Sequence, residues 1–269
     1  MPLAVCATPI GNLGDVTLRV LEELRSADVV LCEDTRHTRL LLDRHGISAR
    51  LLSYHEHNEA ERVAELGPRL KAGERVALVS DAGLPGISDP GASLVRAALA
   101  AGVPVTVLPG PSAVETALVA SGLVAERYVF VGFLPRRAGE LATLWDELHG
   151  WRWPVVAFES PRRLPATLRS LAAVSPEREV AVCRELTKKF EEIVRGRADE
   201  LAARFGDAPK GEVTLVLGPG SRAGDGAEVA AAAEAVADLV AAGARRKPAA
   251  DVVARLTGIS RNDLYRSSL

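Results

Sequence analysis

The stretch RVALVSDAGLPGISDPG, from Arg75 to Gly91, decides the fold assignment. It starts with an apolar run that has no polar face, and it continues into a loop rich in glycine, proline and aspartate. An alanine-rich run with helical spacing follows. Apolar runs without alternation are typical of strands covered by helices on both sides. The stretch therefore predicts one strand, loop and helix of an α/β sheet.

The same alternation of short apolar runs and helical patterns recurs along the chain. Strands are predicted at 3–8, 29–34, 51–55, 75–80, 104–109, 128–133, 155–160, 180–185 and 213–218. Helices are predicted at 16–26, 35–45, 59–71, 92–101, 112–122 and 163–173. Many of these helices begin after Asp, Ser, Thr or Pro, which cap or start helices. The fold class predicted is α/β.

The predicted elements fall into two sets and a tail. We expect one α/β domain at 1–122, a second at 123–220, and a cleft between them. The segment GPGSRAGDG at 218–226 has the composition of a flexible linker. The tail, 227–269, is predicted to be helical, with a long helix at 227–242, a helix opened by Pro248 and another capped by Ser260. Its last two helices resemble a helix-turn-helix, and a helical cap packed on the second domain is the alternative.

Composition narrows the class of protein. The chain has 269 residues and a formal net charge of −2. No apolar run approaches the ~20 residues that a membrane span needs, and the start shows no signal peptide pattern, so a cytoplasmic protein is expected. Three widely spaced cysteines in apolar runs, Cys6, Cys32 and Cys183, favour reduced buried thiols over disulfides or a metal site.

Basic residues cluster in the second half of this nearly neutral chain. The clusters are Arg136–Arg137, Arg162–Arg163, Arg184 with Lys188–Lys189, and 245–247. One such cluster is usually a solvated face, whereas four together favour a polyanionic partner.

The loops after the first strands carry the residues suited to ligand binding, because open α/β sheets bind ligands at the carboxyl ends of their strands. The loop TPIGNLGD at 8–15 lets the backbone approach a ligand at Gly11 and Gly14, but it matches no nucleoside triphosphate motif. Glu33 lies about twenty residues after Gly14, where dinucleotide-binding folds place a ribose-binding acid. An NAD-type site therefore stays open as a minor alternative.

Two further loops combine charge and imidazole. In CEDTRHT, at 32–38, cationic residues open a helix against its dipole, which indicates either an anionic substrate or ion pairs with Glu33 and Asp34. In SYHEHNE, at 53–59, His55 and His57 share a strand face. Solvated surface or substrate hydrogen bonding is favoured there over a metal site, since no third ligand follows the pattern.

The loop quoted first is the richest of these loops. Its strand brings Asp81 to the carboxyl edge of the sheet, where no capping role explains it. Ser88 or Asp89, followed by Pro90, is predicted to cap the next helix. The neighbouring turn PGPSAV, at 109–114, exposes backbone amides at another helix start. Together the two loops predict a pocket for a small polar ligand.

The motifs, taken in order, resemble one known family. They are ATPIGNLGD, EDTRHTRLLL, SYHEHNE, VSDAGLPGISDPG, PGPSAV, FVGFLPRR, FESPRRL, CRELTKKFEEIVRG and KGEVTLVLG. This series resembles the ribosomal RNA small subunit methyltransferase I family, within the tetrapyrrole methylase superfamily. The resemblance runs from about Ala4 to Gly218 and continues into the tail. One departure is FLPRRAGELATLW, which lacks the further basic residue that the family pattern leads us to expect.

The resemblance implies an S-adenosylmethionine-dependent enzyme that methylates the ribose 2′-hydroxyl of a cytidine in the decoding region of 16S rRNA. It also implies a homodimer. Because the basic clusters are dispersed, assembled small ribosomal subunits are the expected substrate. In-line methyl transfer requires no metal, so none is expected, and composition predicts no membrane contact. The cofactor-binding residues that the resemblance implies are Pro9, Val79, Ser80, Asp81, Ser112, Ala113, Phe158, Leu186, Glu212 and Val213. Two alternatives stay open: a precorrin-type tetrapyrrole C-methyltransferase and a non-enzymatic RNA-binding protein.

A ribose hydroxyl is a poor acid, so a carboxylate or imidazole is expected to accept its proton. The candidates are Asp81, Glu33 and His55, with Asp34 and Glu56 in the same group of loops. The residues expected to bind RNA phosphates are Arg36, Arg136, Arg137, Arg162, Arg163, Arg184, Lys188 and Lys189. Stacking on a base is expected from Tyr54 or Phe133.

Overall fold

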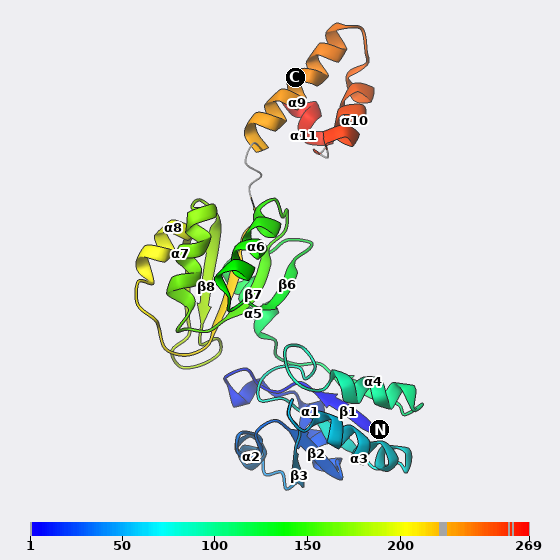
Figure 1. Cartoon of the computed structure of the whole chain (residues 1–269). Coiled ribbons are helices and arrows are strands. Elements are labelled where there is room, and N and C mark those ends of the chain that lie inside the picture. Colours follow the sequence, from blue (N-terminus) through cyan, green and yellow to red (C-terminus); the bar gives the residue numbers. More distant parts are fainter. Residues whose placement is uncertain (1, 221–224, 258, 260, 269) are drawn as a thin grey trace. The chain divides into compact units, whose positions relative to one another are not determined.

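The computed structural model of the chain describes residues 2–220, 225–257, 259 and 261–268 (Figure 1). The chain divides into two compact units. One consists of Met1–Ala138 with Trp153–Gly218, and the other of Gly139–Arg152 with Pro219–Leu269. Each unit is described by itself below.

The first sheet is parallel throughout, with strand order β3-β2-β4-β1-β5. Its strands are β1 (Leu3–Cys6), β2 (Val29–Cys32), β3 (Leu51–Ser53), β4 (Val76–Leu78) and β5 (Val105–Leu108). The elements that connect or follow them are η1 (Leu13–Asp15), α1 (Leu18–Ser26), α2 (Thr35–Arg44), α3 (Glu59–Lys71), α4 (Ala92–Ala100) and α5 (Ala113–Ser121). All carboxyl ends of the strands therefore meet at one edge of the sheet.

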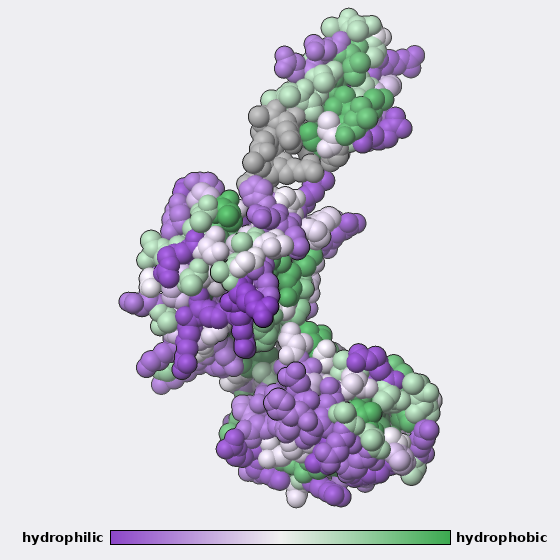
Figure 2. All heavy atoms as spheres, viewed as in Figure 1, coloured by the Kyte–Doolittle hydropathy of each residue, from purple (hydrophilic) through white to green (hydrophobic). Residues whose placement is uncertain are grey.

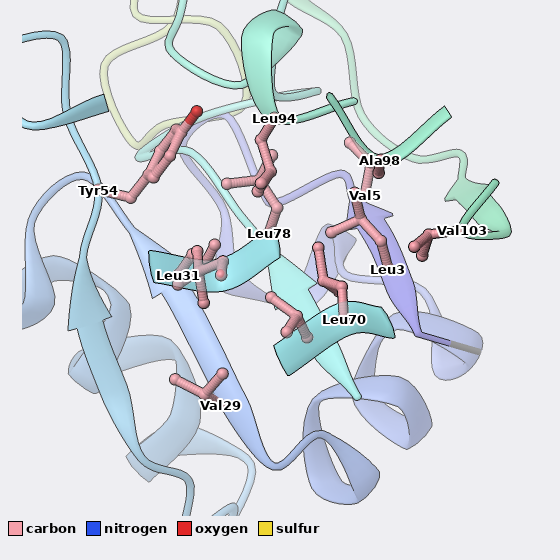
Figure 3. Close-up of a cluster of buried hydrophobic side chains, with 12 residues drawn as sticks. Leu3, Val5, Val29, Leu31, Tyr54, Leu70, Leu78, Leu94, Ala98 and Val103 are labelled. Atoms are coloured by element: carbon pink, nitrogen blue, oxygen red, sulfur yellow. The ribbon is translucent and has the colours of Figure 1, made fainter. Parts of the chain in front are cut away.

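Both faces of this sheet are covered, as the apolar strands predict. Leu3 and Val5 of β1 pack on one face with buried residues of α3 and α4, and Figure 3 shows Leu31, Leu78 and Leu94 converging in that cluster. Ala4 and Cys6 lie on the opposite face, with buried residues of α1 and α2. Alternate residues of a strand point to opposite faces, so an entirely apolar strand requires two covering layers.

The second sheet is mixed, with strand order β6-β7-β10-β8-β9. Its strands are β6 (Val129–Phe133), β7 (Val155–Glu159), β8 (Glu179–Arg184), β9 (Glu192–Arg197) and β10 (Val213–Leu217), and α7 (Leu164–Val174) and α8 (Ala198–Arg204) belong to the same part of the chain. Only β6 and β7 pair in parallel; β10 is antiparallel to both of its neighbours. The apolar sequence of β10 correctly predicted a strand buried on both faces. Such burial does not require parallel pairing, since β10 is antiparallel to β7 and β8.

Helix α5 connects the two sheets within this unit. It follows β5 of the first sheet, and its buried Val114, Ala117 and Leu118 pack with Val156 and Val216 of the second sheet. Because these apolar side chains form one buried cluster, the loops of both sheets meet around the start of α5.

The second unit contains most of α6 (Ala138–His149) and the three helices α9 (Asp225–Ala241), α10 (Arg246–Thr257) and α11 (Arg261–Ser267). Ala232, Val236, Ala249, Val253 and Leu264 are among the residues that form the core shared by α9, α10 and α11. The tail is helical as predicted, but α10 begins two residues before Pro248, since proline is tolerated in a first turn.

Several predictions about element bounds were incomplete. The sequence patterns missed β9, α6 and α8, which lie in charged segments with short apolar stretches. The linker prediction extended too far, because α9 already begins at Asp225. Residues 221–224 of that linker, the predicted Ser260 cap and the Gly258 joint lie outside the described residues.

The fold class is nevertheless confirmed: two α/β sheets with helices, plus C-terminal helices. Cys6, Cys32 and Cys183 are buried free thiols, as predicted. Hydrophilic side chains cover much of the visible face of the unit that carries the two sheets, with smaller hydrophobic patches between them (Figure 2). Among the described residues, no helix is long and apolar enough to span a membrane.

Candidate functional site

A pocket of about 510 Å³ lies where loops of both sheets meet within the first unit. The first sheet and α5 contribute Ile10, Glu33, Asp81, Ala82, Gly83, Leu84, Ile87, Ser88, Asp89, Ser112, Ala113 and Val114. The second sheet and its loops contribute Phe133, Phe158, Glu159, Ser160, Pro161, Cys183, Leu186, Glu212, Val213 and Thr214. The volume is in the range of small-molecule and cofactor sites, and its position at strand carboxyl ends matches the general rule for α/β sheets.

Two loops of the first sheet are locked together at the base of the pocket. Thr8 donates its N–H to the carbonyl of Gly83 at 2.8 Å, and Gly83 donates to the carbonyl of Thr8 at 3.1 Å. The Thr8 hydroxyl also donates to the carbonyl of Ser80 at 3.0 Å. Gly83 has φ +79°, a left-handed conformation that glycine adopts without strain. The loops after β1 and β4 therefore form one rigid floor.

Asp81 joins a third loop to this floor. Its Oδ1 accepts the backbone N–H of Asp34 at 3.1 Å, so the loop after β4 is fixed to the loop after β2. Asp34 in turn caps α2 by accepting the N–H of Arg36 at 2.8 Å. One oxygen of Asp81 thus has a defined positioning role at the edge of the pocket.

Three carboxylates, Glu33, Asp81 and Asp89, line the same part of the pocket. Burial and then the negative charge of Glu33 raise the pKa of Asp89 to about 6, against the opposing effect of a hydrogen bond from Ser80. Burial and the charge of Asp81 also raise the pKa of Glu33, while His55 lowers it. Like charges in a partly desolvated site disfavour ionisation. The arrangement favours a cationic ligand or a protonated group.

Asp89 does not cap α4, in contrast to the prediction. The N-cap residue is Gly91, which makes no side-chain capping bond. Its N–H donates instead to Oε1 of Glu59 at 3.1 Å, from the start of α3. Ser88 has φ +64°, a strained conformation for a residue other than glycine. Neither Ser88 nor Asp89 therefore caps the helix start.

The remaining walls of the pocket are mostly apolar. Phe158 packs edge to face against Phe133, with ring centroids 5.3 Å apart. Ile10, Val114 and Leu186 belong to the buried cluster around α5 and also line the pocket. Phe133 is 65% exposed and lies on the lining, which leaves its ring accessible to a ligand.

An ion pair between Glu159 and Arg163 lies on the side of the pocket formed by the second sheet. Glu159 is buried, and its Oε2 accepts from Arg163 at 2.9 Å and from the Thr167 hydroxyl at 2.5 Å. The Arg163 guanidinium also donates to the carbonyls of Leu134 and Pro135. This network ties the end of β7 to the segment after β6. Arg163 therefore has a structural role in addition to the phosphate contact predicted for it.

The turn after β8 closes against the first loop. Glu185 and Thr187 have φ +52° and +64°, and the Thr187 hydroxyl is buried without a hydrogen-bond partner. A Cβ at Gly11 would lie 2.7 Å from the carbonyl oxygen of Leu186 and 2.8 Å from that hydroxyl. Gly11 thus permits a close approach between loops of the two sheets, beside the pocket residue Leu186.

Seven of the ten residues predicted to bind cofactor line this pocket: Asp81, Ser112, Ala113, Phe158, Leu186, Glu212 and Val213. The other three, Pro9, Val79 and Ser80, are buried in the loops beneath it rather than on its surface. Ser80 donates its hydroxyl to the carbonyl of Ala82 at 3.2 Å, which stabilises the floor.

Among the predicted catalytic residues, Glu33 and Asp81 line the pocket and His55 does not. The Nδ1 atom of His55 is buried without a hydrogen-bond partner, and its Nε2 lies 3.3 Å from Nδ2 of Asn58. His57 is its neighbour, with ring centroids 5.9 Å apart. Among the described residues, no group of three or more His, Cys, Asp or Glu side chains is arranged to hold a metal ion.

None of the eight predicted phosphate-binding residues lines the pocket. Ion pairs are formed by Arg36 with Asp34, by Arg163 with Glu159, by Arg184 with Glu192, and by Lys188 with Glu185 and Glu212. Arg136, Arg137, Arg162 and Lys189 are exposed, and Lys189 lies over the ring of Phe190. In the loop CEDTRHT, at 32–38, Arg36 thus forms an ion pair with Asp34, which was one of the two explanations offered for its cationic residues.

Tyr54 is not available for base stacking, which corrects one of the two expectations. It is 1% exposed, and its hydroxyl donates to Glu59 at 2.7 Å within the first-sheet core (Figure 3). The sequence patterns also missed Asp89, Ile87 and Glu159 as pocket residues. An isolated apolar Ile87 inside a polar loop was a usable signal, whereas the cap explanation concealed Asp89.

The donor set fits S-adenosylmethionine, the cofactor that the family implies. Apolar and aromatic walls suit an adenine ring, the polar backbone of the glycine-rich loops suits ribose and carboxylate groups, and the carboxylates of Glu33 and Asp81 suit a sulfonium and an ammonium cation. The pocket volume of about 510 Å³ accommodates a molecule of that size.

The comparison with protein families gives one match that covers most of the chain. The family described as Tetrapyrrole (Corrin/Porphyrin) Methylases matches residues 2–202. Solved structures with the same fold include a uroporphyrin-III-C-methyltransferase from Thermus thermophilus, with TM-score 0.59 and 22% identity, covering 80% of this chain and 93% of that chain. A cobalt precorrin-4 methyltransferase matches with TM-score 0.57 and 20% identity, over 80% of this chain and 94% of that one.

Relatives of known name are more similar in sequence. Ribosomal RNA small subunit methyltransferase I of Mesorhizobium japonicum is 44% identical over 99% of this chain and 91% of its own length. The protein of the same name from Micromonospora olivasterospora is 44% identical over 98% of this chain and 85% of its own length. The one from Thermotoga maritima is 44% identical over 80% of this chain and 97% of its own length. The chain therefore belongs to the ribosomal RNA small subunit methyltransferase I family, within the tetrapyrrole (corrin/porphyrin) methylases.

Proposed function

We propose that this protein transfers a methyl group from S-adenosylmethionine to the ribose 2′-hydroxyl of a cytidine in the decoding region of 16S rRNA. The observation that carries the proposal is the pocket between the loops of the two sheets, in a chain of this methyltransferase family. The near full-length similarity to relatives named for small-subunit rRNA supports the substrate class. The cytidine, the ribose position and the decoding region rest on the family resemblance.

The cofactor, when bound, supplies an electrophilic methyl group on a sulfonium. Asp81, Ser112, Ala113, Phe158, Leu186, Glu212 and Val213 are the lining residues that we propose hold it. Pro9, Val79 and Ser80 are buried in the loops next to this lining, and the carbonyl of Ser80 accepts the Thr8 hydroxyl. A methyl transfer of this type needs alignment and exclusion of water more than it needs a strong catalyst, and the apolar walls exclude water.

The target ribose must reach the pocket from the RNA surface. Phe133 is exposed beside the lining, so its ring offers a stacking surface for the target base. Arg136, Arg137, Arg162 and Lys189 are exposed, with Arg136 and Arg137 a few residues after Phe133, and they offer cationic contacts to phosphate. We propose assembled small subunits as the substrate, a homodimer as the active form and the cytoplasm as its location.

The first prediction is that the purified protein binds S-adenosylhomocysteine. Isothermal titration calorimetry is expected to give one site per chain with micromolar affinity, ~8 kcal/mol, typical of a small cofactor in such a pocket. Gly11→Ala is expected to weaken binding at least about tenfold, because the new Cβ would force the Leu186 carbonyl and the Gly11 loop apart. Gly67→Ala, in α3 with open space around the new Cβ, is the control. No binding heat from the unaltered protein would contradict the cofactor assignment.

The second prediction concerns the substrate. Methyl transfer from radiolabelled S-adenosylmethionine is expected on assembled small subunits that lack the modification and to be at least about tenfold slower on a short naked RNA of the same sequence, because the exposed basic residues are dispersed. Rising salt is expected to slow the reaction on subunits as phosphate contacts are lost. Equal rates on both RNAs would contradict the need for an assembled subunit.

One other activity has a specific observation in its favour. The fold neighbours named above include tetrapyrrole methyltransferases, and they support a precorrin-type C-methyltransferase as the second candidate function. Their identities to this chain are 22% and 20%, half the value for the rRNA methyltransferase relatives. Methylation of uroporphyrinogen under the assay conditions above would favour this second candidate.

A further inference from the structure

Asp89 is a pocket residue whose position in the loop is not explained by the helix that follows. At the start of α4, Glu59 rather than Asp89 bonds the N-cap residue: its Oε1 accepts the N–H of Gly91 at 3.1 Å. Ser88, immediately before Asp89, is held at φ +64°. Strained backbone of this kind costs of order 1–3 kcal/mol and concentrates at functional sites. The loop therefore presents Asp89 to the pocket at an energetic cost that the helix does not require.

Four other carboxylates line the pocket, and two of them are ion-paired: Glu159 with Arg163 and Glu212 with Lys188. The other two, Asp81 and Glu33, are also less suited to accept a proton. Asp81 uses Oδ1 to accept the Asp34 N–H at 3.1 Å, which holds the carboxylate in place and occupies one of its oxygens. Glu33 is more exposed than Asp89, so its carboxylate keeps more contact with water. Asp89 is half-buried, and the exposed side chains of Ile87 and Phe133 are on the same lining. Gly132 approaches this loop, since a Cβ there would lie 3.8 Å from the Ser88 hydroxyl.

We infer that Asp89 is the catalytic residue that accepts the proton of the attacking ribose hydroxyl. The inference rests on the proposed function. In the step, the hydroxyl oxygen forms a bond to the methyl carbon while its O–H bond breaks and the proton passes to the Asp89 carboxylate. The bond from the methyl carbon to sulfur breaks, and its electron pair remains on sulfur. Asp89 then releases the proton to water.

The electrostatic surroundings support this role. The charged groups that act on Asp89 are Glu33 and Asp81, from the ends of β2 and β4, and both are acidic. His55 acts on Glu33 and partly offsets that group's raised pKa. With burial as the largest cause, the pKa of Asp89 rises to about 6. A base is most effective when its pKa lies near the working pH, so this carboxylate is a stronger base than an ordinary aspartate and is still ionised at pH 7.

A titration without cofactor tests the premise directly. Carboxyl ¹³C NMR of the full-length protein, with the Asp89 resonance assigned by its loss in Asp89→Asn, is expected to show a midpoint near pH 6. Glu33→Gln removes a neighbouring negative charge, so the midpoint is expected to move to lower pH in that variant. A midpoint near pH 4 in the unaltered protein, unchanged by Glu33→Gln, would overturn the inference.

Kinetics test the role itself. For the unaltered protein, kcat/KM on small subunits is expected to rise through about pH 6 to a plateau, because the base must be ionised. Asp89→Asn is expected to lower kcat at least about 100-fold and to lose that acid limb, with affinity for S-adenosylhomocysteine within about twofold. Asp89→Glu is expected to recover part of the rate, and Asp43→Asn, an exposed carboxyl on α2, is the control.

The outcomes separate the inference from the function on which it rests. An Asp89→Asn variant with the rate and pH profile of the unaltered protein would overturn the inference and leave the methyltransferase function standing. Failure of the unaltered protein to transfer a methyl group to small subunits would instead overturn the proposed function itself.

Discussion

At the residue scale, the ionised side chain of Asp89 lowers the stability of the folded protein. Its carboxyl is half-buried beside Glu33 and Asp81, and its ionised form is disfavoured in the folded state. The sign follows from the two pKa values, about 4 in the unfolded chain and about 6 in the folded protein. The folded state holds the proton more tightly, so the penalty is absent below pH 4, grows between pH 4 and 6, and is complete above pH 6.

Replacing Asp89 by Asn is therefore expected to stabilise the protein while it removes activity. After allowance for solvent screening of a half-exposed group, the gain is ~1 kcal/mol above pH 6, or about 2–4 °C in melting temperature. Calorimetric melting of the two proteins at pH 4 and pH 7.5 measures the difference. Identical melting temperatures at pH 7.5, with Asp43→Asn unchanged as the control, would show that the carboxyl carries no electrostatic penalty.

The sequence identified Asp81 and Glu33 as pocket carboxylates because each directly follows an apolar strand. It assigned Asp89 to helix capping, because Asp before Pro is a common helix start. That assignment failed because the N-cap is Gly91, two residues later, and its N–H is bonded by Glu59 from α3. A bond across 32 residues leaves no local pattern, so sequence alone could not have separated the two roles.

At the scale of elements, the first sheet follows closely from its sequence. Continuous apolar strands, capped helices and short connections predict its strands and helices within a few residues. The second sheet was harder, because β9 carries Glu192, Arg195 and Arg197 among its apolar residues and resembles an exposed segment. This segment is a strand because it pairs antiparallel with β8, and its composition alone does not indicate that pairing.

The junction of β4, its loop and α4 depends on Gly91. Its φ of +139° excludes other residues without strain, and a Cβ there would lie 2.9 Å from Cδ2 of the buried Leu78. Gly91→Ala is expected to destabilise the protein by ~2–3 kcal/mol, measured by urea unfolding. Gly139→Ala, at a site in α6 with open space around it, is the control and is expected to change stability by less than ~1 kcal/mol. Equal stability of the two variants would show that position 91 does not require glycine.

At the scale of the whole molecule, the pocket belongs to neither sheet alone. Asp81 and Ser112 come from loops of the first sheet, whereas Phe158 and Val213 come from the second, about 45 to 130 residues later in the chain. Composition and periodicity identified the strands, but only the family resemblance indicated which second-sheet residues face the pocket. The exposed basic residues lie outside this lining, so their contacts with RNA phosphates stay a prediction from the sequence.

The central claim is methylation of one ribose in small-subunit RNA, and mass-spectrometric mapping of 16S rRNA tests it most directly. RNA from a strain that lacks this gene, from the same strain complemented with it, and from the strain carrying Asp89→Asn would be digested and compared. The account predicts a 2′-O-methylcytidine in the decoding region that is lost on deletion, restored by the unaltered gene and strongly reduced with Asp89→Asn. An unchanged decoding-region map in the deletion strain, or a methyl group on a base instead of a ribose, would contradict it.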